Sequence, residues 1–73
     1  MRRPITPGSK TILRHLIRRG SISPVEAFAS YGTLRLAARI HELREAGNVI
    51  KTQIRADAAN HRYARYTLVQ QQV

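Results

Sequence analysis

The chain has 73 residues, with thirteen Lys or Arg against four Asp or Glu, and a formal net charge of +9 at pH 7. A chain this short forms one domain with a small core, and without cysteine it has neither a disulfide framework nor thiolate metal sites. No apolar run approaches the ~18 residues of a membrane span, and the basic start lacks a signal peptide's apolar segment, so we expect a cytoplasmic protein. The charge favours a polyanionic partner such as nucleic acid, because neutralised phosphates release counterions. A solubilising surface or an acidic partner protein is the alternative.

The first predicted helix runs from Pro7 to about Arg19. Thr6 can cap it, and Pro7 suits the first helical position because its missing N–H needs no partner there. Gly20 ends it. The pattern predicts a buried apolar stripe and an exposed basic face. The stripe consists of Ile12, Leu13, Leu16 and Ile17, and the basic face of Lys10, Arg14, Arg18 and Arg19.

A second, short helix is predicted from Pro24 to about Ser30. Ser23 and Glu26 stand at the spacing of a capping box, in which each side chain bonds the other residue's backbone N–H. Before it, the β-branched Ile22 can add a short extended segment. We expect this helix to bury Val25, Phe28 and Ala29.

The third helix is predicted from Thr33 to Ala46, and the chain is organised around it. Gly32 permits a sharp corner before it, Thr33 can cap it, and Gly47 supplies the left-handed residue that commonly ends a helix. Its expected buried face consists of Leu36, Ala37, Ile40 and Leu43. Two helices joined by a short glycine-containing turn form a helix-turn-helix, which directs the N-terminal half of the second helix outward.

From Asn48 onward the apolar period changes from 3.6 to 2, which predicts a β-hairpin. Residues 48–56 and 61–69 form its strands, and Asp57 to Asn60 supply turn residues. One face is expected on the core and the other in solvent, bearing basic and aromatic side chains. The expected core face carries Ile50, Thr52, Ile54, Ala64, Tyr66 and Leu68. The domain organisation is then a flexible basic arm (1–6), one domain (7–69) and a frayed tail (70–73).

Three helices followed by a hairpin predict an α+β fold, the winged helix-turn-helix. The run ISPVEAFASYGTLRLAARIHELREAGNVIKT and the closing RYARYTLV resemble the small winged helix-turn-helix proteins of phages and prophages. The resemblance covers roughly residues 11–69. It implies a single-domain, sequence-specific double-stranded DNA-binding protein, a phage or prophage transcription regulator, placed at the nucleoid or in the host cytoplasm.

In this geometry the third helix enters the major groove, where Arg35 and Arg39 could reach guanine or phosphate and Ala38 permits close approach. Thr33 could bind a phosphate at the helix start. His41 and Glu45 are spaced to pair, and Glu42 either pairs within the helix or lies beyond the DNA footprint. Arg44 is expected to extend along the apolar surface or to pair with Glu26.

The wing carries further candidates for contact with the DNA backbone or minor groove. These are Lys51, Arg55, Arg62, Tyr63 and Arg65. Arg2 and Arg3 on the arm either enter a minor groove or belong to a disordered terminus.

Catalysis is not expected, and neither is a cofactor. His15, His41 and His61 lie on different elements without metal-ligand spacing, and no nucleophile or phosphate-loop motif is present. The rival hypothesis is a protein-interaction module that docks on RNA polymerase or recombination machinery, with Leu34 and Ala38 in its patch. RNA binding ranks third, because few aromatic side chains are available for stacking. The expected state is a monomer or a DNA-assisted dimer.

Overall fold

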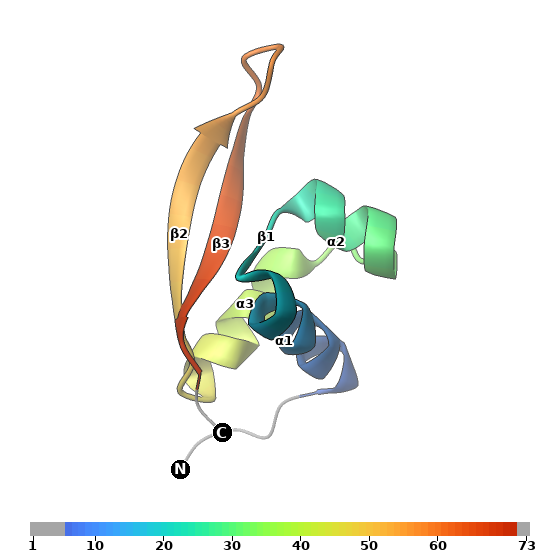
Figure 1. The fold of residues 1–73 in the computed structure, drawn as a ribbon. Helices are drawn as coiled ribbons and strands as arrows, with labels where there is room; N and C mark the ends of the chain where they lie inside the picture. The colour runs from blue at the N-terminus through green and yellow to red at the C-terminus, as the bar shows by residue number, and fades with distance from the viewer. Residues whose placement is uncertain (1–5, 72–73) are drawn as a thin grey trace.

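A computed structural model describes residues 6–71 of the chain. In this range the order of elements is α1 (Pro7–Arg19), β1 (Ser21–Ile22), α2 (Pro24–Tyr31), α3 (Leu36–Glu45), β2 (Val49–Ala56) and β3 (Arg62–Gln70). The three helices lie on one side of the sheet, and the β2–β3 hairpin extends beyond them (Figure 1). The longest dimension of the Cα trace is 43 Å against 23 and 20 Å, because the hairpin projects from the helices.

The caps of the first two helices are those predicted from the sequence. Thr6 accepts a bond from the Ser9 backbone N–H at the start of α1, and Gly20 ends the helix in the left-handed conformation. Ser23 and Glu26 form the full capping box of α2. At Gly32, φ is +68°, so the corner between α2 and α3 uses a conformation that favours glycine.

The sheet has the order β1-β3-β2, and both pairings are antiparallel. Ile22 pairs with Tyr66, which confirms the extended segment expected before α2. Strand β3 extends to Gln70, which pairs with Val49, so the hairpin reaches one residue past the expected domain end at 69. The Asp57 carboxylate accepts bonds from two backbone N–H groups in the turn, those of Ala59 and His61.

The core lies where the helices meet the base of the sheet. Its buried side chains are Ile12, Leu16, Ile22, Ala27, Leu36, Ile40, Leu43 and Ile50. Leu13, Tyr66 and Leu68 pack against it while remaining partly exposed. At roughly 1.5–3 kcal/mol per buried aliphatic side chain, this set supplies most of the apolar stabilisation of a small domain.

The prediction for the buried face of α2 is wrong. Val25 is 74% exposed and Phe28 is 54% exposed, whereas Ala27 is fully buried. Ala29 is exposed as well. The reason is tertiary: Glu26 pairs with Arg65 of β3 and Ala27 belongs to the core cluster, so the bulkier apolar side chains face outward.

Four other burial predictions are also wrong. Ile17 is 49% exposed and Ala37 is exposed, because each lies at the margin of its helix's buried stripe. On the hairpin, Ile54 is 65% exposed and Thr52 is exposed, although both share the core-facing side with Ile50. The helices cover only the base of that side, and the distal half stands clear of them (Figure 1).

Candidate nucleic-acid interface

The helix α3 begins later than predicted. Its N-cap is Arg35, which makes no side-chain cap bond, so the prediction that Thr33 caps the helix is wrong. Thr33 instead accepts a bond from the Arg35 backbone N–H at 3.1 Å, which shapes the turn before the helix. Arg35 is exposed, and its side chain makes no ion pair within residues 6–71.

The solvent-facing side of the first turn of α3 carries two small side chains, Ala37 and Ala38, which are both exposed. Just before the helix, Leu34 is 83% exposed and Arg35 is exposed as well. One turn further, His41 pairs with Glu45 at 2.9 Å, as their spacing predicted. Because α3 contains two arginines and two glutamates, the helix carries no net charge with histidine neutral. Small side chains let this helix approach a partner closely, but its own charge does not attract a polyanion.

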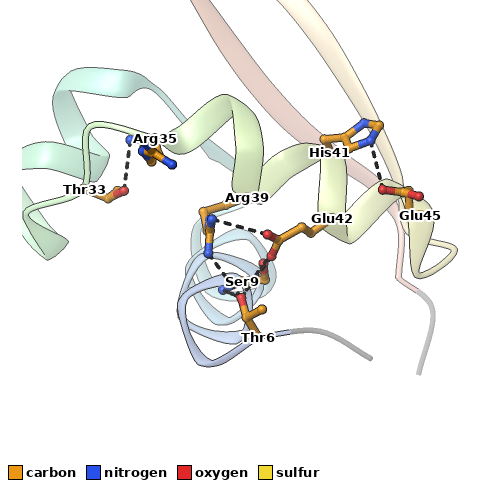
Figure 2. A network of polar contacts seen from close by, with 8 residues as sticks. All are labelled: Thr6, Ser9, Thr33, Arg35, Arg39, His41, Glu42 and Glu45. Carbon is orange, nitrogen blue, oxygen red and sulfur yellow. Dashed lines mark hydrogen bonds and ion pairs between the residues drawn. The ribbon is translucent and has the colours of Figure 1, made fainter. Parts of the chain in front are cut away.

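Arg39 lies in a polar network that joins α3 to the start of α1 (Figure 2). Its Nη2 lies 3.3 Å from Glu42 Oε2, and its Nη1 donates to Thr6 Oγ1 at 3.3 Å. Glu42 Oε1 accepts from Thr6 Oγ1 at 2.9 Å and from Ser9 Oγ. The guanidinium also packs on Gly8, where an added Cβ would come within 3.3 Å of Nη1. Arg39 is therefore held in place, with its side chain 25% exposed.

The network explains the state of Glu42. The Ser9 hydroxyl, then the Thr6 hydroxyl and the Arg39 charge, lower the pKa of Glu42 below its usual value of 4.5. Glu42 thus remains ionised at neutral pH and pairs with Arg39 within the helix, the first of the two roles expected for it.

A pocket of about 330 Å³ opens beside this network. It lies between the start of α1 and the turn that precedes α3. Its lining consists of Gly8, Thr11, Ile12, Tyr31, Thr33, Arg35 and Arg39. Two predicted contact arginines and Thr33 are therefore brought together at one concave site, where guanidinium and hydroxyl groups suit a phosphate.

The hairpin divides the wing candidates between its two faces. Antiparallel partners share a face, and Arg55 pairs with Tyr63 while Lys51 pairs with Thr67, so these residues lie on the side away from the core. Arg62 pairs with Ala56 on the opposite side, near the tip. Lys51, Arg55 and Arg62 are exposed. The wing thus presents cations on both faces rather than on one.

The side chain of Arg65 binds other residues of the domain. Its Nη1 donates to Ser21 Oγ at 2.8 Å and lies 3.1 Å from Glu26 Oε1, so it ties β3 to β1 and α2. Burial alone would raise the pKa of Glu26, but the bond from the Ser23 N–H and the Arg65 charge outweigh burial and lower it. The prediction that Arg44 pairs with Glu26 is therefore wrong: Arg44 donates to the Ile50 carbonyl and to Thr52.

Two buried polar residues were not predicted from the sequence. Ser9 is fully buried and supplies a hydroxyl to Glu42, while Asn48 donates through its side-chain amide to the Leu43 carbonyl at 2.9 Å. Asn48 follows Gly47, which ends the helix. This position beside the last turn was the sequence signal that could have predicted its bond to a helix carbonyl. Ser9 stands three residues after the N-cap, a position that gives no sign of its distant partner.

Arg2 and Arg3 lie outside the described residues. Within residues 6–71, no cluster of three or more His, Cys, Asp or Glu side chains could hold a metal ion. The helices of the same range are too short and too polar to cross a membrane.

Comparison with protein families agrees with this architecture. A family model described as a winged helix-turn-helix domain matches residues 8–71. Comparisons with curated proteins and with solved structures found no match. Winged helix-turn-helix domains are DNA-binding rather than catalytic modules, so DNA is the general class of partner that the family supports. With nearly its whole length matched, the chain belongs to the winged helix-turn-helix family.

Proposed function

We propose that this protein is a sequence-specific regulator that binds duplex DNA, of the kind that phages and prophages use to control gene expression. The observation that carries the proposal is the combination of a helix-turn-helix, small exposed side chains on α3 and a net charge of +9. Alanines at positions 37 and 38 allow the helix backbone to approach base edges in the major groove.

The contacts on α3 have separate tasks in this proposal. Arg35 is the base-reading residue, because it is exposed, has no ion pair within the described residues and stands at the start of the helix. Arg39 and Thr33 bind a backbone phosphate at the pocket they share with Arg35. Ala38 faces the base edges between them.

The wing supplies most of the free positive charge near DNA. Lys51 and Arg55 contact one backbone from the outer face, with Tyr63 beside them, and Arg62 reaches a phosphate or the minor groove from the other face. Arg65 contributes indirectly, by bracing β3 against α2. Arg2 and Arg3 are proposed to follow the minor groove next to the site.

Selection of bound sequences from a random duplex pool tests the proposal. The wild-type protein should enrich one motif, and Arg35→Ala should reduce discrimination at one position by about 1–3 kcal/mol. Arg19→Ala removes the same charge from α1, so it should leave the motif unchanged. Failure to enrich any motif would contradict sequence-specific binding.

Exposed apolar side chains favour a second candidate function, docking on RNA polymerase or recombination machinery. Val25, Phe28 and Leu34 are all more than half exposed, although they belong to the helix-turn-helix. Salt titration separates the candidates, because DNA binding weakens steeply with salt whereas apolar docking does not. Negligible DNA affinity at low salt together with direct binding to a purified polymerase would favour docking.

A further inference from the structure

The exposed face of α1 carries a row of cations that the proposed DNA contacts do not use. Lys10, Arg14 and Arg18 follow one another at intervals of four residues, so they lie along one side of the helix. All three are exposed, and none forms an ion pair within residues 6–71. We call these three residues the α1 row.

The distribution of acids makes the α1 row unusual for this domain. Helix α1 contains no acidic residue, whereas Glu26 pairs with Arg65, Glu42 with Arg39 and Glu45 with His41 on the other elements. A face kept charged only for solubility would mix both signs, as α3 does. The uncompensated positive charge of the helices therefore gathers on α1.

The stability of α1 does not account for the α1 row. Arg18 and Arg19 stand in the last turn, where cations interact favourably with the helix dipole. Lys10, however, lies in the first turns, where the dipole disfavours a cation, and like charges four residues apart repel each other. An external anion bound along the row would remove this repulsion.

The α1 row and the α3 surface lie on different sides of the domain. Ile12 and Leu16 of α1 share one core cluster with Ile40 and Leu43 of α3, so each helix turns its exposed face away from the other. The start of α1 lies against α3, where Thr6 accepts a bond from Arg39 (Figure 2). A duplex seated on α3 and the wing therefore leaves the α1 row free.

From this arrangement we infer that α1 is a second DNA-binding surface, through which one protein molecule holds a second duplex by its phosphate backbone. The inference rests on the proposed function for the first duplex. Side chains four residues apart in a helix are spaced about 6 Å along its axis, close to the ~6.8 Å axial rise of two nucleotides along one strand. The row recognises charge without reading bases, so any duplex serves as the second partner.

A bridging experiment with the full-length chain tests the inference. One duplex carries the selected motif and is immobilised, and a second, unrelated duplex is labelled and free. The wild-type protein should retain the labelled duplex at low salt. The triple variant Lys10→Gln, Arg14→Gln, Arg18→Gln should reduce retention at least tenfold, while its affinity for the motif duplex alone, measured by anisotropy, should change less than about threefold. The retained signal should also fall with salt with a slope of about −2.7 from the three cations of the α1 row.

The matched control removes three cations from the wing, through Lys51→Gln, Arg55→Gln and Arg62→Gln. It should weaken binding of the motif duplex itself.

Bridging that survives the α1 substitutions would overturn the inference, because protein dimers would then explain it. Equal loss of motif affinity in both triple variants would overturn it too, by placing α1 on the first duplex. If the wild type binds a single duplex but does not retain a second one, the inference is wrong and the proposed function stands. If the wild type binds no duplex at all, the proposed function is wrong. Circular dichroism verifies that α1 stays folded.

Discussion

Glu42 is the residue that most restricts Arg39, because its carboxylate holds the guanidinium at 3.3 Å and adds a negative charge to α3. We expect Glu42→Gln to strengthen the proposed contact of Arg39 with a phosphate, because the guanidinium no longer shares its charge with a carboxylate, and to raise duplex affinity about two- to fivefold, the range of an exposed ion pair. The slope of log affinity against log salt should steepen, by less than the value of about 0.9 that one wholly new phosphate contact would give.

Glu45→Gln is the matched control, since it removes the same charge from the same helix without touching Arg39. Its salt slope should stay at the wild-type value. An unchanged slope in Glu42→Gln would show that Glu42 does not limit the contact of Arg39 with phosphate.

The lowered pKa values of Glu26 and Glu42 predict acid sensitivity. Both groups are more acidic in the folded chain than the usual 4.5, so their stabilisation is present above pH 4.5 and is lost as pH falls through the folded values. The midpoint of thermal unfolding should therefore fall steeply below pH 4.5. The double variant Glu26→Gln, Glu42→Gln should be less stable at pH 7 and should show a shallower acid decline. A decline as steep as in the wild type would assign the sensitivity to other groups.

At the scale of elements, α2 offers a direct test of packing. Phe28→Ala should cost less than about 1 kcal/mol of unfolding free energy, because the ring is more than half exposed. Leu16→Ala should cost about 2–5 kcal/mol, because that side chain is buried in the core. Chemical denaturation of both variants measures the difference. Equal costs would mean that Phe28 is buried in solution.

The caps of α1 and α2 and the corner before α3 could be predicted from sequence because their causes are local. Thr6 with Pro7, the Ser23–Glu26 box and Gly32 each act on neighbouring backbone groups. The buried face of α2 could not be predicted, since its eight residues make only about two turns and the burial of Ala27 is decided by tertiary packing in the core cluster. Burial on the hairpin could not be predicted either, because it depends on how far along the strands the helices cover the sheet. Likewise, nothing near Arg39 or Arg65 in the sequence indicated their distant partners Thr6 and Ser21.

The wing's contribution should be non-specific. Lys51→Gln with Arg55→Gln removes two exposed cations from one face and should reduce the salt slope of duplex binding by about 1.8. The selected motif should stay the same, because backbone contacts do not read bases. A changed motif would assign base reading to the wing.

At the scale of the whole molecule, the charge is divided among surfaces. Helix α3 is neutral overall, so our proposals assign the attraction to DNA mainly to the wing, to Arg35 and to the α1 row. In these proposals α3 provides close approach to the bases, and the surrounding elements provide the electrostatic attraction.

Because the chain has no cysteine, disulfide trapping gives the most direct test of the proposal that α3 occupies the major groove. Ala38→Cys should crosslink to a thiol tethered at cytosine N4, which lies in the major groove, within the selected motif. Ala58→Cys in the hairpin turn should instead react with a tether at guanine N2 in the minor groove. Phe28→Cys should react with neither tether. Crosslinking of Phe28→Cys in place of Ala38→Cys would place α2, not α3, against the bases and would contradict the account.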